Sequence, residues 1–488
     1  MASLEEIRQE RLKKLSLLKE AGIDPYPAQV ADSLEINQIL ADFTALEEAS
    51  STVSIAGRIM AMRGQGGLVF ADVYDGTSAM QVVIKADNLS ATSFELFQNT
   101  LDVGDFVHVT GVAFTTKRGE KSLEISNWTI LSKSLRSLPE KWHGLKDEEE
   151  RLRKRYLDIL TNEEVKDIVI KRSIFWSSIR NFLSDRGFLE VDTPVLENLA
   201  GGAEAEPFVT HHNALDLDVF LRISPELWLK RLMVAGMPKV FEIGRIFRNE
   251  GMDAEHLQDY TQVEWYWAYS DYNKAMDLVK ELYQEVALKT FSTTKFNIKD
   301  FAIDLAGPWE TYDYVATILE KTGVNVLTAD LTEMMAKIDS LGIKYDKNGF
   351  SRNRAVDNLW KYCRRQIAGP GFLINVPVFM EPLAKKKADN PEVVERFQVL
   401  LAGSEMGKGF SELNDPIDQA ERFDDQSKLR AAGDKEAQMY DTDFVEAMEY
   451  GMPPCSGFGV SERLFSFLSN KTVRETQIFP LMRPKNQD

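Results

Sequence analysis

The sequence predicts an α+β protein in which a small N-terminal β-barrel precedes a larger domain, built on a mainly antiparallel sheet flanked by helices. Three observations predict this class. Short β-rich runs fill residues 53–132. From residue 161 onward, strand-like runs follow one another through short loops, which favours antiparallel pairing. Helical runs with a single apolar face are interspersed among these strands.

Length and composition exclude several classes of protein. With 488 residues, the chain is too long for one ordinary hydrophobic core, so we expect two or three domains. It has no apolar run of about 18 residues, and its charged start lacks the apolar stretch of a secretion signal, so we expect no membrane span. The net charge of −18 argues against a protein that coats nucleic acid non-specifically. Cys363 and Cys455 form no CxxC pair, so we expect a cytoplasmic location and no structural zinc.

The first part of the chain predicts one helix and five strands. The helix spans residues 4–21 and stops before Gly22. The strand-like runs cover residues 53–63, 67–75, 79–86, 106–116 and 122–132. Five short strands in about 80 residues suit a barrel of the OB type, although any small β-barrel would give this pattern. The charged stretch that follows has no β pattern, so we expect a first domain over 1–140 and a linker over 141–160.

The domain expected over 161–488 begins with a long helix. Thr161 and Glu164 match a capping box, and one apolar face continues up to Gly187. Strand-like runs then lie at 188–196, 207–223, 239–249, 260–268, 372–380, 396–414 and 455–460. The stretch of about 309–366 predicts an inserted helical piece.

Three segments carry polar groups in patterns that suit chemistry. In the run 239–268, Gln262, Glu264 and Tyr266 share one strand face, which indicates either a polar pocket or a half-exposed hairpin. In 403–415, Phe410 and Glu412 alternate after a Gly-Lys-Gly bend, as they also would in a plain hairpin with a charged rim. In 453–468, a Gly-rich strand precedes a helix that starts near Ser461, which is weak evidence for phosphate binding. No GxxxxGK[ST] loop and no GxGxxG after a strand is present.

Together these segments resemble motifs 2 and 3 of the class II aminoacyl-tRNA synthetases, and SDRGFLEVDTPVLE (184–197) resembles motif 1. The class I sequences HIGH and KMSKS are absent. Within class II, the resemblance is to the bacterial-type lysyl-tRNA synthetases and covers nearly the whole chain. The runs that carry it include GIDPYP, FADVYDG, RYLDIL, GGAEAEPFVTHHNALD, LRISPELWLKRL, FEIGRIFRNEG, GFSELND and TVRETQIFPLMRP.

The resemblance implies ATP and Mg²⁺, with L-lysine and tRNA(Lys) as partners and a homodimer formed through helix 164–186 and the strand after it. Lysine would be activated to lysyl-adenylate and then transferred to the tRNA 3′ end. Arg248 is implied to bridge the α-phosphate and the lysine carboxylate, with Arg463 as the second catalytic arginine. The implied ATP-binding residues are Arg248, Glu250 (adenine amino group), His256 (γ-phosphate), Tyr260 (stacking on the adenine), Glu405 (metal) and Arg463 (ATP tail or adenine).

A lysine pocket needs at least two anions, because the amino acid carries two ammonium groups. The resemblance implies that Glu226 and the backbone at Gly202 bind the α-amino group, while Glu412 and Tyr266 bind the ε-amino group with Glu264 close by. Lys408 and Phe410 complete the implied pocket, and Glu405 and Glu412 are the implied metal ligands.

Three departures from the family pattern are visible. Gln398 stands where a metal-binding glutamate is expected. Lys408 stands in place of an asparagine, where it could bind the lysine carboxylate or pair with Glu412 and block the site. Motif 3 is one residue short before Arg463, with Ser461 in place of a glycine. These departures keep two alternatives open: a class II ligase for another amino acid, or a catalytically inactive paralogue that binds RNA or regulates.

The resemblance implies that the barrel reads the anticodon. Arg63, Phe70 and Gln81 stand where uridines are stacked and hydrogen-bonded, and Glu120 looks like a further anticodon-reading residue. Phe70 could instead belong to the barrel core, and Glu120 could be a plain turn residue.

Overall fold

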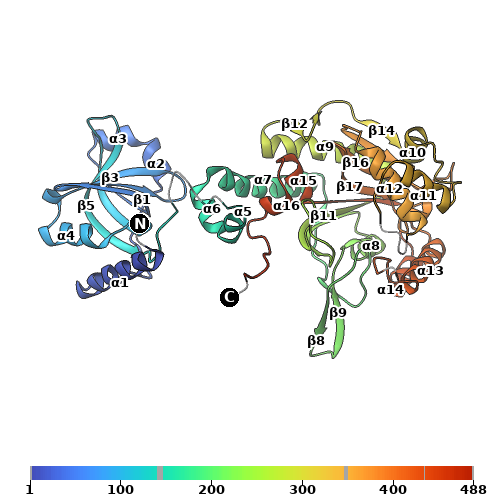
Figure 1. Cartoon of the computed structure of the whole chain (residues 1–488), viewed down its shortest axis with the longest axis horizontal. Coiled ribbons are helices and arrows are strands. Elements are labelled where there is room, and N and C mark those ends of the chain that lie inside the picture. The colour runs from blue at the N-terminus through green and yellow to red at the C-terminus, as the bar shows by residue number, and fades with distance from the viewer. Residues whose placement is uncertain (1–2, 140–144, 146, 346–349, 434, 486–488) are drawn as a thin grey trace. The chain divides into compact units, whose positions relative to one another are not determined.

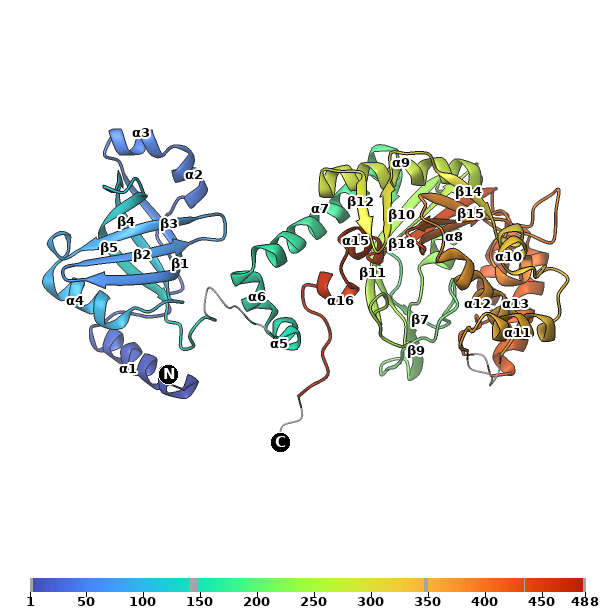
Figure 2. The same ribbon diagram turned by 45° about the horizontal axis from the view of Figure 1, so that its top comes forward.

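The computed structural model describes residues 3–139, 145, 147–345, 350–433 and 435–485 (Figures 1 and 2). It divides into two compact units, Met1–Glu148 and Glu149–Asp488. The predicted linker 141–160 begins in residues outside those described, and its second half forms helices α5 (Glu148–Arg153) and α6 (Arg155–Thr161). None of the helices described is long and apolar enough to cross a membrane.

The first unit contains the predicted barrel. Strand order is β1-β2-β3-β5-β4, and parallel pairing of β3 with β5 closes it, while β1 pairs antiparallel with both β2 and β4. All five predicted strands are confirmed, and Ile55, Val82 and Ile125 are among the side chains that fill the interior. The strands are β1 (Thr52–Gln65), β2 (Leu68–Tyr74), β3 (Ala79–Lys85), β4 (Phe106–Thr115) and β5 (Lys121–Ser132).

Helices cover the barrel from outside. The first predicted helix is confirmed as α1, where Ser3 and Glu6 form a reciprocal capping box and Gly22, with φ of +75°, follows the last turn. The helices of this unit are α1 (Leu4–Glu20), α2 (Ile36–Ala41), α3 (Phe43–Glu48), η1 (Ala86–Asn88) and α4 (Ala91–Thr100).

The second unit is built on a large sheet. Its strand order among the described residues is β14-β15-β16-β17-β18-β11-β10-β6, antiparallel from β15 to β10 and parallel only at the two edges. The mainly antiparallel sheet predicted from the short loops is therefore confirmed. Its strands are β6 (Leu189–Glu190), β10 (Lys239–Phe247), β11 (Asp259–Ala268), β14 (Glu310–Asp313), β15 (Gly371–Ile374), β16 (Arg396–Leu401), β17 (Ser404–Ser411) and β18 (Cys455–Ser461).

Two smaller sheets accompany the large one. The predicted strand 207–223 is a hairpin that also pairs with the short strand at the end of motif 1. The smaller strands are β7 (Leu196–Glu197), β8 (Val209–His212), β9 (Leu217–Leu221), β12 (Lys295–Ile298) and β13 (Phe301–Asp304).

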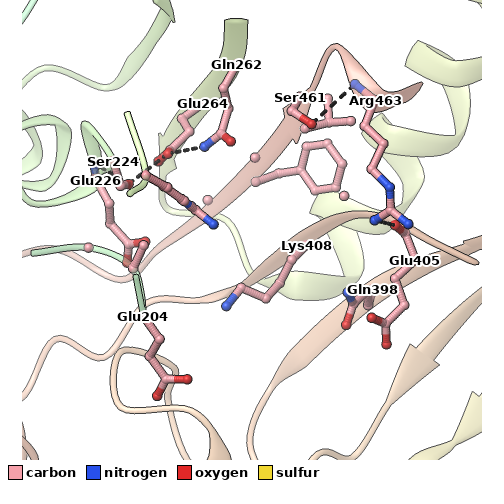
Figure 3. Close-up of a pocket in the computed structure, with 18 of the residues that line it drawn as sticks. Glu204, Ser224, Glu226, Gln262, Glu264, Gln398, Glu405, Lys408, Ser461 and Arg463 are labelled. Carbon is pink, nitrogen blue, oxygen red and sulfur yellow. Dashed lines mark hydrogen bonds between the residues drawn. The ribbon is translucent and has the colours of Figure 1, made fainter. Parts of the chain in front are cut away.

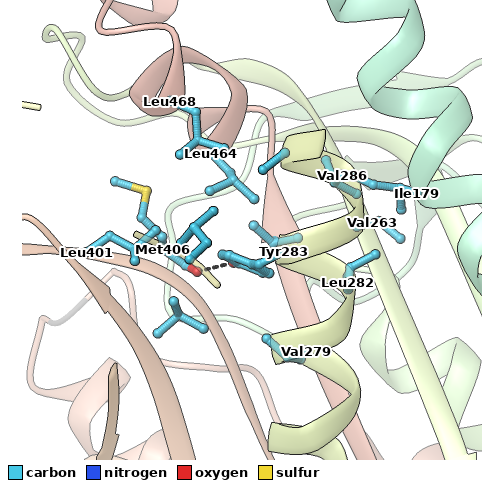
Figure 4. Close-up of a cluster of buried hydrophobic side chains, with 14 of the residues drawn as sticks. Ile179, Val263, Val279, Leu282, Tyr283, Val286, Leu401, Met406, Leu464 and Leu468 are labelled. Atoms are coloured by element: carbon cyan, nitrogen blue, oxygen red, sulfur yellow. Dashed lines mark hydrogen bonds between the residues drawn. The ribbon is translucent and has the colours of Figure 1, made fainter. Parts of the chain in front are cut away.

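The large sheet separates two hydrophobic clusters, because successive side chains of each strand point to opposite faces. Val263 and Trp265 of β11 pack in the cluster under α7 (Glu163–Asp185) and α9 (Tyr272–Phe291). Tyr266 and Ala268 pack in the cluster under α8 (Glu226–Val234), α10 (Tyr314–Thr322) and α12 (Arg352–Arg364). Figure 4 shows the first cluster, in which the Tyr283 hydroxyl donates to the backbone of β17. The predicted alternation of polar and aromatic faces on β11 is confirmed.

Helix positions differ from the sequence prediction in two places. Asn162 rather than Thr161 caps α7, since its side chain accepts from the backbone of Glu164. The predicted helical piece 309–366 starts with β14, an edge strand, before its helices. The helices are α7 (Glu163–Asp185), α8 (Glu226–Val234), α9 (Tyr272–Phe291), α10 (Tyr314–Thr322), α11 (Leu331–Ser340), α12 (Arg352–Arg364), η2 (Val378–Met380), α13 (Pro416–Ala431), α14 (Thr442–Glu449), α15 (Arg463–Leu468) and α16 (Val473–Thr476).

Candidate active site

A cavity of 420 Å³ opens on the face of the sheet that carries Gln262, Glu264 and Tyr266. Strands β11, β17 and β18 form its floor (Figure 3). Residues of the loop between β10 and β11 line one end of it. Every residue that the sequence assigned to ATP or lysine lines this cavity. They are Gly202, Glu226, Arg248, Glu250, His256, Tyr260, Glu264, Tyr266, Glu405, Lys408, Phe410, Glu412 and Arg463, and Gln398 lines it as well.

Arg248 follows β10 and faces Tyr260 of β11. Its guanidinium carbon lies 5.7 Å from the centre of the Tyr260 ring, and one Nη donates to the backbone oxygen of Ile223 at 3.4 Å. Its Nε is buried and has no hydrogen-bond partner among the described residues. Burial raises the pKa of nearby Glu250. A planar arginine beside an aromatic ring and a carboxyl group can hold an anion and a purine.

The loop between β10 and β11 is organised by Asp253. Its carboxylate accepts hydrogen bonds from the backbone nitrogens of Glu255 and His256, at 2.7 and 2.8 Å. The same carboxylate contacts Nδ1 of the exposed His256 ring at 2.9 Å, which leaves Nε2 for another group. His256 is therefore fixed at the outer end of the cavity, where a phosphate tail can reach it.

Arg463, the first residue of α15, crosses to β17. It donates from Nη1 to the backbone oxygen of Glu405 at 3.1 Å, and its Nη2 forms an ion pair with Glu255 (Figure 3 shows the first contact). Although burial opposes it, Arg463 and Lys299 hold the pKa of Glu255 below its ordinary value. The shortened motif 3 therefore still delivers Arg463 to the cavity.

We call the end of the cavity that is lined by Glu226, Tyr266 and Glu412 its inner end. Glu264 lies at the centre of this end and has only neutral hydrogen-bond partners. It accepts from Ser224 Oγ at 2.8 Å, from Gln262 Nε2 at 2.6 Å and from the Tyr266 hydroxyl at 3.1 Å (Figure 3). Burial raises the pKa of Glu264 to about 7. A cation that enters here would meet a carboxylate with no positive partner of its own.

A buried lysine connects the other two carboxylates of this end. Lys230 of α8 places its Nζ 2.6 Å from Glu226 and 2.5 Å from Glu412. Burial alone lowers the pKa of Lys230, but the two carboxylates outweigh it and raise that pKa above its ordinary value. Burial raises the pKa of Glu412 well above the usual range, which Lys230 partly counteracts.

Two glycines allow the backbone to approach these side chains closely. A Cβ at Gly457 of β18 would lie 2.4 Å from Glu412 Oε1 and 2.5 Å from the Tyr266 ring. Gly202 has a φ of +82°, and a Cβ there would lie 2.9 Å from the Glu226 side chain. Larger residues at either position would fill space beside the carboxylates.

Lys408 pairs with Glu381 rather than with Glu412, so the alternative in which it pairs with Glu412 and blocks the site is not supported. Its Nζ lies 3.4 Å from Glu381, and its side chain is half exposed at the cavity. Glu381 also pairs with Arg396 at 3.0 Å, and Arg396 donates to the side-chain oxygen of Gln398. Lys408 is thereby left facing the cavity, where it can meet a substrate carboxylate.

The residues that line the cavity could hold a magnesium ion that binds together with ATP, but they do not provide a full set of protein ligands for it. No group of three or more His, Cys, Asp or Glu with metal spacing occurs in the described part of the chain. Glu405 accepts from the Trp360 indole through one oxygen only, at 2.6 Å, so the other oxygen is available. Glu412 pairs with Lys230 through Oε2, so its role as a second metal ligand stays a prediction. Mg²⁺ often takes one or two carboxylates and fills the rest of its shell with phosphate and water.

The barrel carries the residues assigned to the anticodon outside its core. Phe70 is half-buried between the buried Val69 and Ala71, so it lies on the outer face, and the core alternative is wrong. The Arg63 guanidinium lies 5.4 Å from the Phe70 ring on the paired strand. Gln81 accepts from Ser122 at 3.2 Å, and Glu120 is exposed in the turn before β5.

Three residues of the site, Lys230, Glu255 and Glu381, were not predicted from the sequence. Lys230 had a detectable signal, because it shares the buried face of α8 with Leu227 and Glu226 at helical spacing. No sequence pattern pointed to Glu255 or Glu381, since the residues with which they pair lie far away in the chain.

Comparison with known proteins agrees with this arrangement. Residues 147–483 match the family of class II tRNA synthetases (D, K and N), and residues 53–131 match the OB-fold nucleic acid binding domain. The lysine–tRNA ligase of Thermotoga maritima is 42% identical over 99% of this chain and 97% of its own length. Those of Moorella thermoacetica and Carboxydothermus hydrogenoformans are 44% and 43% identical, over 98% and 99% of both chains. The chain therefore belongs to the class II tRNA synthetases of the D, K and N group and carries an OB-fold anticodon-binding domain.

Proposed function

We propose that this chain is a lysine–tRNA ligase that activates L-lysine with ATP and transfers it to tRNA(Lys). The observation that carries the proposal is the inner end of the cavity, where Glu226, Glu264 and Glu412 converge beside Tyr266. Lysine is the common amino acid that brings two ammonium groups and a chain long enough to join two such carboxylates. Lys408, which pairs with Glu381 rather than Glu412, leaves this end open and removes the reason to prefer another amino acid.

Lysine binds with its α-ammonium at Glu226 near Gly202, its alkyl chain along Phe410, and its ε-ammonium between Glu412 and Tyr266. Its carboxylate then points to Lys408 and Arg248. Lys230 lowers the pKa of Glu412 against the larger effect of burial, so more of this carboxylate stays ionised than burial alone would allow.

ATP lies at the other end, with the adenine against Tyr260, its amino group at the Glu250 carboxyl, and its phosphates toward His256 and Arg463. The lysine carboxylate attacks the α-phosphorus, the bond to the bridging oxygen breaks, and pyrophosphate leaves. Arg248 stabilises the charge that develops on the α-phosphate oxygens, so catalysis is mainly positioning and electrostatics. Mg²⁺ held by Glu405, with Gln398 beside it, would supply charge neutralisation on the phosphates. In the second step the tRNA 3′ hydroxyl takes the lysyl group and AMP leaves.

The outer face of the barrel binds the anticodon through Arg63, Phe70 and Gln81, with Glu120 at the rim. Stacking on Phe70 suits an unpaired base, and the adjacent Arg63 suits its phosphate. We also propose a homodimer through the motif 1 region, in the cytoplasm. Supporting the dimer are exposed apolar side chains on α7, on β6 and around β7: Ile170, Ile174, Leu189, Val195, Leu196 and Leu199.

The experiment is amino-acid-dependent exchange of pyrophosphate into ATP, run with all twenty amino acids. Exchange with lysine alone, or far above the others, is the expected result; exchange with none refutes the ligase, and exchange with another amino acid refutes lysine. Arg248→Ala and Arg248→Lys should both lose exchange by at least about 100-fold while the protein stays folded, since a single ammonium cannot replace the planar fork.

A further inference from the structure

Lys230 is a charged residue in a place where packing alone would select an apolar one. It is fully buried and lies behind the wall of the cavity rather than on its surface. A methionine has nearly the same length and would fill this space without the cost of burying an ammonium. The positive charge of Lys230 is therefore explained by the two carboxylates that it contacts.

Each of those carboxylates gives one oxygen to Lys230 and keeps the other. Glu226 uses Oε1, at 2.6 Å, and Glu412 uses Oε2, at 2.5 Å. The remaining oxygen of Glu412, Oε1, is buried and has no hydrogen-bond partner among the described residues. It faces Gly457 on the cavity floor, in the space that a Cβ would fill.

The contacts of Lys230 fix the distance between the carboxylates of Glu226 and Glu412. Because one nitrogen holds both carboxylates, Glu226 on a helix and Glu412 after a strand cannot move apart independently. We propose that Lys230 is a specificity-determining residue: it sets the separation and orientation of the two carboxylates that receive the α- and ε-ammonium groups, and so sets the length of the amino acid accepted. This inference rests on the proposed function.

The charges at this end of the cavity agree with that role. Glu226, Glu264 and Glu412 carry three negative charges when ionised, and Lys230 supplies one positive charge. The remaining two match the two ammonium groups of lysine. Tyr266 and Cys455, whose pKa values burial raises, also face this cluster and are neutral at physiological pH.

The test compares the unaltered full-length protein with Lys230→Met and Lys230→Arg, using lysine and ornithine (one methylene shorter) in pyrophosphate exchange. Lys230→Met should raise the KM for lysine by about 100-fold at pH 7, the order expected when a buried pair loses one partner, and should reduce the preference for lysine over ornithine by about tenfold. The KM for ATP should stay within about twofold. The lysine defect should shrink as the pH is raised, because the loss of Lys230 removes a contact that lowers the pKa of Glu412, and a higher pH restores the carboxylate.

Lys230→Arg keeps the charge but has a larger head, which projects further toward the cavity. It should shift preference toward ornithine while the protein remains folded, so it decides the question if Lys230→Met does not fold. Lys289→Met, an exposed lysine on α9, is the matched control and should change neither KM.

Three outcomes are distinguishable. An unaltered protein that does not activate lysine refutes the proposed function. An unaltered protein that activates lysine, with both variants showing the original lysine-to-ornithine preference, overturns only the role of Lys230. Equal losses for ATP and lysine at every pH assign Lys230 to folding alone and also overturn it.

Discussion

Glu255, in the loop between β10 and β11, holds the guanidinium of Arg463 at the start of α15. The two residues are far apart in the chain, and their pair occupies the end of the cavity where the ATP tail is proposed to bind. Lys299 reaches Glu255 from the other side at 3.4 Å. An incoming phosphate must therefore compete with a carboxylate that belongs to the protein.

Removal of that carboxylate charge should favour ATP. We expect Glu255→Gln to lower the KM for ATP by about two- to fivefold, the range for a partly exposed ion pair, with the KM for lysine unchanged. Steady-state pyrophosphate exchange measures both values. Glu333→Gln, exposed on α11, serves as the control, and a higher KM for ATP in Glu255→Gln would contradict the competition.

Lysine binding should depend on pH through Glu264, whose pKa burial raises to about 7. The ionised carboxylate attracts an ammonium group and the neutral acid does not, so the KM for lysine should fall as the pH rises through about 7. Glu264→Gln should flatten this dependence in the pH profile of exchange. A profile in Glu264→Gln identical to that of the unaltered protein would assign the titration to another group.

Glu197 offers a stability test outside the proposed chemistry. It is buried in β7, accepts from the Trp228 indole at 2.6 Å, and burial raises its pKa to about 7. Since the folded state holds a proton that the unfolded state releases above its ordinary pKa, stability is lost as the pH rises from about 4.5 to 7.

We therefore expect Glu197→Gln, which keeps an acceptor for the indole, to raise the free energy of unfolding of the second unit at pH 8 by roughly 1–3 kcal/mol and to change it little at pH 4.5. Urea unfolding followed at both pH values measures this. A gain of the same size at both values would rule out proton linkage as the cause.

Gly457→Ala should damage lysine binding specifically. The added methyl group would lie 2.4 Å from Glu412 Oε1 and 2.5 Å from the Tyr266 ring, in a strand that cannot move away. We expect the KM for lysine to rise by at least about tenfold while the KM for ATP changes much less. Gly67→Ala, whose methyl group meets only an ordinary contact at 3.5 Å, is the control, and equal KM values for lysine in the two variants would oppose the proposed pose.

The barrel should act only in the second step. Phe70→Ala and Arg63→Ala should each lower aminoacylation of tRNA(Lys) by about tenfold, the order of one lost stacking contact, and leave pyrophosphate exchange unaltered. Comparison of the two assays on the same preparation measures this. A loss of exchange in parallel with aminoacylation would indicate a folding defect rather than anticodon binding.

Much of this architecture could be predicted because it is local. The strand alternation of Glu264 and Tyr266 follows from backbone geometry, and the five barrel strands follow from β-rich runs between turn residues. The edge strand β14 was missed, since its four residues form a strand only by pairing with β15. Asn162 displaced Thr161 as the cap for a similar reason, because two adjacent residues can both cap and the surrounding chain selects one.

The cavity could be predicted as a set of residues but not as a network of contacts. Sequence spacing predicts that Lys408 lies on the same strand face as Phe410, but it does not predict the partner of Lys408. Its partner, Glu381, comes from a distant loop, so the choice between Glu381 and Glu412 depends on tertiary structure. The same holds for Lys230, whose second carboxylate lies far along the chain.

The indole of Trp360 would give the helical segment a part in the proposed phosphate chemistry. Its hydrogen bond orients Glu405 from α12, so one side chain of that segment determines which carboxylate oxygen is left for a metal. Substitutions in α12 would then alter the use of ATP and magnesium while amino-acid selection stays intact. If the proposed sites are right, the two ends of the cavity are adjusted from different helices, α12 at the nucleotide end and α8 at the amino-acid end.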